Sequence, residues 1–240
     1  MAVGLVPETH HRGNPDRAEH RWPAVGAALV ALALYAFLPS DFEPILRIVV
    51  VAVCLAVLVV LIIVNPHRMR RQTTWSRWLS IGLVAVLGIA NYVAFVQLIL
   101  MLIEAEVDQD ASLLLASAQV WGTNVVVYAL LYWELDRGGP VTRSSAPRTE
   151  LPRADIRFPQ DENGDAITEV ASGSSYGADW TAGFIDYLYV SASNSMSFSP
   201  PDAVPLTTRM KIFFGLQALS GFVLLVLVIA RAVALLGGGS

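Results

Sequence analysis

Long apolar runs alternate with short polar stretches along the chain, and this alternation predicts helices that cross a membrane. A helix of about 20 apolar residues spans the roughly 30 Å of hydrocarbon in a bilayer. The predicted spans cover residues 22–38, 46–64, 78–103, 113–133 and 210–236. The fold class we expect is an all-α integral membrane protein with five transmembrane helices and a short re-entrant segment before the last one.

The polar stretches divide the chain into four regions. Residues 1–21 are polar and carry two prolines, which is typical of a disordered N-terminal tail. Residues 22–133 hold the first four spans. Residues 134–179 are rich in turn formers and poor in large apolar side chains, so we expect a polar cytoplasmic linker that does not fold by itself. Residues 180–236 form a module of the short segment and the last span.

Composition agrees with membrane insertion and argues against several functions. Hydrophobic residues make up 55% of the chain and charged residues 15%, against about 25% charged in soluble domains. Cys54 is the only cysteine, so no intrachain disulfide and no cysteine-based metal site can form. The adjacent His10 and His11 have no third ligand nearby, and no catalytic or phosphate-binding motif occurs. We therefore expect no metal, no cofactor, no nucleic-acid partner and no enzymatic activity.

Loop charges predict the orientation, because loops rich in arginine and lysine stay in the cytoplasm. The connection 65–77 carries four arginines and no acid, and the segment 134–179 carries five more arginines. The connections 39–44 and 104–112 are acidic and lack basic residues. The N-terminus and the segment 134–179 should therefore be cytoplasmic. Lys211 is the only lysine among many arginines, a trace of GC-rich coding that hints at an actinobacterial source. The location that we expect is a bacterial plasma (inner) membrane.

The segment 180–199 is too polar to face lipid along its whole length, since each polar group in hydrocarbon needs a partner. Its polar residues include Ser191, Ser193, Asn194, Ser195, Ser197 and Ser199. At helical spacing, one face carries Trp180, Phe184, Tyr187, Leu188 and Ser191. Pro200 and Pro201 then prevent further helix. We expect a short helix that dips into the membrane, shielded by other helices, and turns back.

This stretch resembles the pore region of potassium channels, where a short aromatic helix and a filter precede the inner helix. The pore-helix pattern is matched by Asp186, Leu188, Tyr189 and Ser191, and the segment after the filter by Asp202, Val204 and Pro205. Where the channels have T-V-G-Y-G, this chain has Ser197-Phe198-Ser199-Pro200-Pro201. Proline cannot adopt the positive φ that aims the channel carbonyls at the ion. Potassium selectivity of that type is therefore not expected.

The same stretch is more similar to a bacterial family of multi-pass membrane proteins of unknown function. Members of that family have four spans, a polar connection, the signature D-F-L-Y-F-x-F-T-x-G-M-T-F-Q-x-S-D and a last span. The signature is matched here by Asp186, Leu188, Tyr189, Met196, Ser197, Phe198 and Asp202. The specific part of the resemblance covers about fifty C-terminal residues.

Two functions remain open at this point. The first is a channel-like protein that passes ions or small solutes with low selectivity through an oligomeric pore, with a monovalent ion as a candidate permeant species. Its pore-lining candidates are Ser193, Asn194, Ser195, Ser197, Ser199 and Asp202. The resemblance to channels implies a homotetramer in the lipid bilayer. The alternative is a non-conducting membrane scaffold or accessory subunit that retains a pore-loop fold without a working filter.

The remaining polar residues of the spans are expected to have structural roles. We expect Asp186 to cap or anchor the re-entrant helix by pairing with Arg209, with coordination of an ion as the alternative role. Glu104 and Glu134 are expected to be solvated at span ends. Hydrogen bonds between helices are expected for the amide side chains Asn91, Gln97, Gln119, Asn124 and Gln217. One consequence of the arginine distribution is that the pore-like segment lies on the cytoplasmic side, whereas potassium channels hold theirs outside.

Overall fold

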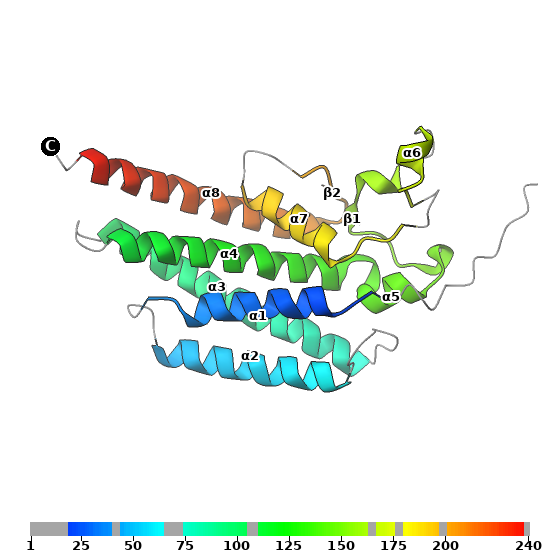
Figure 1. The fold of residues 1–240 in the computed structure, drawn as a ribbon, viewed down its shortest axis with the longest axis horizontal. Coiled ribbons are helices and arrows are strands. Elements are labelled where there is room, and N and C mark those ends of the chain that lie inside the picture. Colours follow the sequence, from blue (N-terminus) through cyan, green and yellow to red (C-terminus); the bar gives the residue numbers. More distant parts are fainter. Residues whose placement is uncertain are drawn as a thin grey trace, which may run out of the picture.

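The protein is a bundle of long helices with a folded polar cap at one end (Figure 1). The computed structural model describes residues 19–39, 44–64, 74–104, 110–162, 167–175, 180–196 and 201–237. The bundle contains α1 (Trp22–Ala36), α2 (Pro44–Val64), α3 (Thr74–Glu104), α4 (Asp110–Leu135) and α8 (Thr208–Gly237). α1, α3 and α8 begin at the end of the bundle where α2 and α4 finish, and we call this the cap end.

Four of these helices are long and apolar enough to cross a membrane: α2, α3, α4 and α8. Their bounds lie within four residues of the spans predicted from the sequence. The predicted first span, 22–38, is represented by α1, which has 15 residues. At 1.5 Å per residue α1 is only about 22 Å long, which is shorter than the hydrocarbon of a typical bilayer. Among the described residues, four helices are therefore long enough to cross a membrane, and a fifth crossing is not shown.

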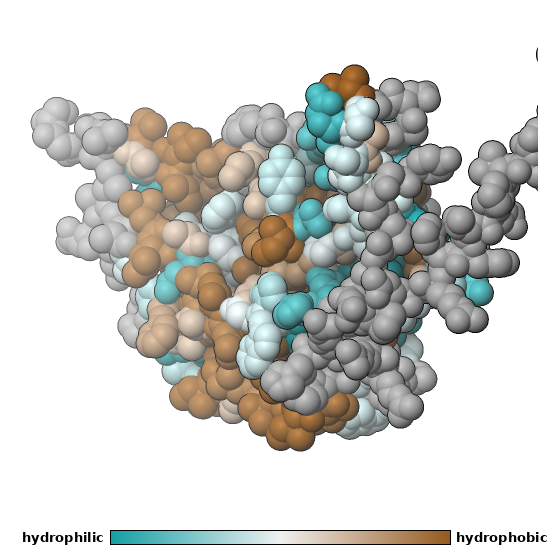
Figure 2. Space-filling view, turned by 45° about the vertical axis from the view of Figure 1, so that its right-hand side comes forward, coloured by the Kyte–Doolittle hydropathy of each residue, from teal (hydrophilic) through white to brown (hydrophobic). Residues whose placement is uncertain are grey.

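α4 is the central helix of the bundle and packs against α1, α3, α7 and α8. In the most apolar stretch of α4, 67% of the residues are buried inside the protein, whereas the corresponding shares are 22% for α2 and 28% for α8. The outer faces of α2 and α8 are correspondingly apolar, with exposed residues such as Ile48, Ile63, Leu219 and Ile229. Hydrophobic residues cover broad areas of the surface in Figure 2, interrupted by polar ones. An apolar exterior around a more polar central helix is the arrangement that lipid requires.

The cap is the folded part of residues 136–162 and 167–175. It consists of η3 (Asp136–Gly138), α5 (Pro140–Ser145), η4 (Arg148–Glu150), β1 (Ile156–Arg157), η5 (Pro159–Asp161) and α6 (Thr168–Ala171). The chain reverses after α4 through Arg137, Gly138 and Gly139, all with positive φ. A side chain at Gly138 would also meet Pro152 and Thr142 at 3.1 and 3.2 Å, so this turn requires glycine.

The cap is more ordered than the linker predicted for residues 134–179. Ile156 and Phe158 are buried in the same core as the helix bundle, and Asp136 and Asp155 are buried with them. The composition gave no sign of this order, because the segment has few apolar residues and is held by ion pairs within itself and by ion pairs and hydrogen bonds to the helices. Residues 163–166 and 176–179 of the predicted linker lie outside the described residues.

Between the cap and α8 the chain forms a hairpin, defined here as α7 (Phe184–Ser195), β2 (Val204–Pro205) and the described residues between them, 196 and 201–203. α7 begins at the cap, where the Tyr187 hydroxyl donates to Asp136 at 2.6 Å. It ends beside the middle of α8, where the Ser195 carbonyl lies against Gly221. By β2 the chain is back at the cap, because Val204 and Pro205 pair antiparallel with Arg157 and Ile156 of β1. The hairpin therefore enters and leaves the bundle at the same end (Figure 1).

Candidate functional site

The polar residues predicted to line a pore fall into three groups. Asn194 and Ser195 are buried, and Ser191, which precedes them on the same face of α7, is fully buried. Ser193 is half-buried and Asp202 is exposed. Ser197 and Ser199 lie outside the described residues, and so does Pro200, the first of the two prolines that replace the channel filter. The buried group faces α4 and α8.

The buried face of α7 is held by a hydrogen-bond network centred on Gln217 of α8. The Gln217 amide nitrogen donates to the carbonyl oxygen and the hydroxyl of Ser191 at 3.0 and 2.6 Å. Its amide oxygen accepts from the Tyr132 hydroxyl at 2.7 Å and from Asn194 at 2.9 Å. Every donor and acceptor of the Gln217 side chain is thus paired, although the residue is fully buried.

Two further bonds connect α7 to its neighbours. The Ser191 hydroxyl donates to the Val125 carbonyl of α4 at 2.7 Å, and the Asn194 amide donates to the Phe214 carbonyl of α8 at 3.0 Å. Polar groups inside a membrane bundle are stable only when they are paired in this way. The polar groups of Ser191 and Asn194 on the buried face of α7 are therefore paired within a single chain.

The other amide residues of the long helices were also predicted to bond between helices. Gln119 of α4 donates to the Phe37 carbonyl at the end of α1 at 3.0 Å, and Asn124 of α4 donates to the Ser220 hydroxyl of α8 at 3.3 Å. With Gln217, these contacts confirm the prediction for three of the five amides. Asn91 is buried in α3, where its side-chain oxygen has no hydrogen-bond partner among the residues that the structure describes.

At the cap end, Arg143 of α5 closes the end of α4. Its guanidinium donates to the carbonyls of Trp133 and Asp136 at 3.0 and 2.8 Å, and to the Ala182 carbonyl at 3.1 Å. It also lies 4.8 Å from the centre of the Tyr187 ring. A cation at a helix C-terminus satisfies carbonyls that lack helical partners and is stabilised by the helix dipole. Arg143 thereby joins α4, α5 and the start of α7.

The start of α7 is capped by two carboxylates. Asp186 accepts from the Gly183 backbone N–H at 2.8 Å, as expected for a residue that anchors this helix. Glu19 accepts from the Phe184 N–H at 2.6 Å and from the Trp133 indole at 3.0 Å, with Arg143 3.8 Å away. Burial raises the pKa of the Glu19 carboxyl, while the Arg143 charge and these two hydrogen bonds oppose the rise.

The predicted pairing of Asp186 with Arg209 is wrong. Arg209 forms a two-pronged ion pair with Asp155 of the cap, which also accepts from Thr207 at 2.5 Å. The reason is the hairpin geometry: β2 carries the start of α8 to β1, beside Asp155, while Asp186 faces the first turn of its own helix. Arg209 therefore anchors the return of the hairpin, and Asp186 anchors its entry.

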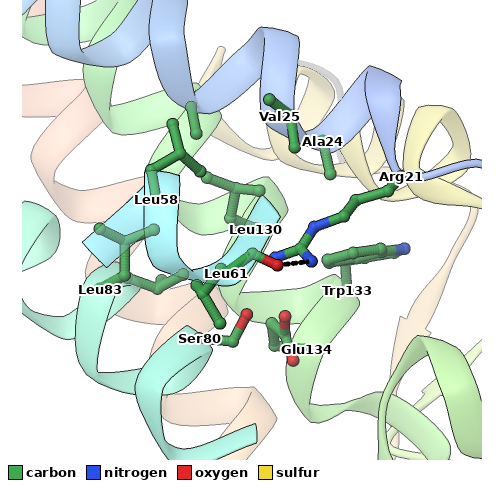
Figure 3. A pocket seen from close by; sticks show the side chains of 12 residues that line it. Arg21, Ala24, Val25, Leu58, Leu61, Ser80, Leu83, Leu130, Trp133 and Glu134 are labelled. Atoms are coloured by element: carbon green, nitrogen blue, oxygen red, sulfur yellow. Dashed lines mark hydrogen bonds between the residues drawn. The ribbon is translucent and has the colours of Figure 1, made fainter. Parts of the chain in front are cut away.

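Glu134 was expected to be solvated and is instead 4% exposed. It lines a small cavity of about 30 Å³ near the cap end, where α1, α2, α3 and α4 meet (Figure 3). In Figure 3 the Ser80 hydroxyl and the Glu134 carboxyl point toward one another beneath Leu61, and Arg21 reaches in from above to donate to the Leu61 carbonyl. The remaining lining is almost wholly apolar.

Sequence reasoning missed Glu19 and Asp136 because their partners lie far away along the chain, and it missed Arg143 because Ala182, the partner that joins it to the start of α7, is 39 residues away. Trp133 is 114 residues from Glu19, and Tyr187 is 51 residues from Asp136. Within the described residues no group of three or more His, Cys, Asp or Glu side chains is placed to hold a metal ion. The site is therefore a set of hydrogen bonds and ion pairs that holds a hairpin in a helix bundle.

Comparisons with protein-family models, with curated proteins and with solved structures find no match to this chain. The resemblance of residues 186–205 to channel pore regions, and to the bacterial multi-pass family, stays a prediction from the sequence.

Proposed function

We propose that this protein is a five-span protein of a bacterial plasma membrane, with α7 as a re-entrant helix on the cytoplasmic side. Four helices of sufficient length and an apolar exterior support insertion. α1 would complete the fifth crossing with local thinning of the bilayer, which costs only fractions of a kcal/mol per Å of mismatch. The cap end carries Arg21 before α1, Arg77 in the first turn of α3 and the five arginines of residues 137–157, which supports a cytoplasmic cap.

Impermeant maleimide labelling tests this orientation in a Cys54→Ala background. A cysteine at exposed Ser172 in the cap should react only after the membrane is opened. A cysteine at Phe37, which is 77% exposed beyond the other end of α1, should react in intact spheroplasts. The reverse pattern would contradict the proposed orientation.

The function that we propose is that of a non-conducting membrane scaffold or accessory subunit that retains a pore-loop fold. The observation that carries this proposal is the pairing of Ser191, Asn194 and Gln217 within one chain. A pore-lining polar group faces water along the pathway, whereas these groups are directed at α4 and α8. The hairpin thus acts as a structural element of the bundle.

Two measurements on the purified full-length protein test this function. In planar bilayers we expect no current above the protein-free baseline. In nanodiscs that hold one chain each, the α7 amides should keep the slow hydrogen exchange that they show at higher occupancy, because their bonds are intrachain. Single-channel currents, or loss of α7 protection in single-chain nanodiscs, would contradict the scaffold proposal.

A channel-like function is the second candidate, and the positions of Ser193 and Asp202 support it. Both are at least partly exposed although they belong to the hairpin, so they are free to face a pathway between several copies of the chain. In this reading a homotetramer would pass a monovalent ion with low selectivity. If currents are found, Ser193→Leu should reduce them while Ser172→Leu in the cap leaves them unchanged. Equal currents in both variants would exclude a pathway lined by Ser193.

A further inference from the structure

The cavity lined by Glu134 has a largely apolar wall, and the Glu134 carboxyl has one oxygen without a hydrogen-bond partner among the described residues. Glu134 is 4% exposed, and its Oε2 atom has no hydrogen-bond partner among the described residues. The carboxyl does receive a hydrogen bond from the Ser80 side chain. Leaving a buried polar atom unpaired costs about 1–3 kcal/mol, and more when the group is charged. An occupant that pairs with Oε2 is therefore strongly favoured.

The size of the cavity limits what that occupant can be. A water molecule needs roughly 10–15 Å³ of such space, so a cavity of about 30 Å³ admits one or two waters. A lipid headgroup or an organic metabolite is far larger. The polar side chains on the wall, Arg21, Ser80 and Glu134, supply the two or more hydrogen-bonding partners that an internal water requires.

The charges around Glu134 make a metal cation a poor occupant. Three arginines act electrostatically on Glu134: Arg21 before α1, Arg77 of α3 and Arg143 of α5. α2 contributes only Leu58 and Leu61 to the cavity wall, and α1 contributes Ala24, Val25 and Ala28. The Glu134 carboxylate is already balanced by these arginines, of which Arg143 also lies 3.8 Å from the Glu19 carboxylate, so a sodium ion would find no uncompensated negative charge, whereas a neutral water needs none. A proton bound covalently to the carboxylate needs no space of its own.

We propose that this cavity is a hydrated proton-binding site, in which an internal water pairs with Oε2 of Glu134 and carries protons to it from the cap end. The reaction is reversible and consumes nothing else: a hydronium ion gives its proton to the carboxylate oxygen, which leaves a glutamic acid and a water. The site stands apart from the hairpin network, so it does not depend on whether the protein conducts ions.

Infrared difference spectroscopy of the full-length protein in lipid nanodiscs tests this site. Between acid and alkaline pH we expect a band of a buried protonated carboxyl group, which shifts when the buffer is changed to D2O because the water gives access to solvent. The band should vanish in Glu134→Gln and persist in Glu169→Gln, since Glu169 is exposed in the cap. Persistence of the band in Glu134→Gln, absence of any such band, or a band insensitive to D2O would overturn the proposal.

The variant Ser80→Ala keeps the proposal testable if Glu134→Gln does not fold. Removing the Ser80 hydroxyl takes a hydrogen bond from the Glu134 carboxyl, so its protonated band should move to higher wavenumber. An unchanged band in Ser80→Ala would show that the signal belongs to another group, and the assignment to Glu134 would be wrong.

Discussion

At the residue scale, single polar side chains join the helices through hydrogen bonds in the least apolar parts of the sequence. Gln217 pairs with three side chains from two other helices, and Arg143 joins the end of α4 to the start of α7. The hydrogen bonds of these amide side chains could be predicted from the sequence, because an amide inside a membrane span has few possible partners other than groups on another helix. The burial of Glu134 could not be predicted from the sequence, because its position at the end of a span gives no sign that Arg21 and Ser80 line the same cavity.

Replacement of Gln217 by methionine should destabilise the bundle by about 2 kcal/mol. It removes four hydrogen bonds, each contributing about 0.6 kcal/mol between membrane helices, and keeps the side-chain volume similar. Steric-trap unfolding in bicelles measures this loss. The matched control is Gln97→Met, at a half-buried amide of α3. Equal stability of the two variants would contradict the role of Gln217.

Asp161 should make the stability of the cap depend on pH. Its carboxylate accepts from Arg137 at 2.6 Å, the Ser175 hydroxyl at 2.9 Å and the Phe158 N–H at 3.0 Å. Burial alone would raise the pKa of Asp161, but the Phe158 N–H, the Arg137 charge and the hydrogen bonds outweigh it and lower the pKa below 3.8. Its stabilising effect is therefore present above pH 3.8 and is lost as pH falls through the lower, folded-state pKa.

Thermal unfolding of the wild-type chain and of Asp161→Asn measures this effect. At neutral pH the variant should unfold at lower temperature, and the difference should disappear in acid, where the wild-type carboxyl is also neutral. A difference that stays constant down to strongly acidic pH would mean that the charge of Asp161 does not stabilise the cap.

At the scale of elements, the hairpin depends on the close approach of α7 to α8. A side-chain carbon at Gly221 would come within 2.2 Å of the Ser195 carbonyl oxygen, so only glycine fits there. The long helices and the position of the hairpin helix were predictable, because apolar runs and a proline pair mark them. The pairing of β1 with β2 and the order of the cap were not, since two-residue strands and isolated ion pairs leave no periodic pattern.

Gly221→Ala should loosen α7 while leaving the long helices intact. Overpacking of this kind costs about 1–3 kcal/mol, and hydrogen exchange at the α7 amides should quicken accordingly. Gly215→Ala is the matched control, because nothing lies within 4 Å of a side-chain carbon at that glycine of α8. Similar exchange rates at α7 in both variants would contradict the close packing of the hairpin.

At the scale of the whole molecule, the central claim is that α7 enters the bilayer from the cap side and that the chain returns to the same side. α7 has 12 residues, about 18 Å of helix, which is too short to cross. The described hairpin ends at β2, beside the cap where it began. Apolar residues such as Ile185 and Tyr189 are exposed on its outer face, as expected for contact with lipid.

Spin-label depth measurements test this claim most directly. Single nitroxides at Ser172, Met196 and Leu206, all exposed, would be compared in a Cys54→Ala chain for collisions with oxygen, which concentrates in lipid, and with a polar nickel complex. We predict that Met196 at the tip of α7 lies well inside the hydrocarbon while Ser172 and Leu206 both lie in water. A label at Met196 as accessible to the nickel complex as the label at Ser172 would contradict the account.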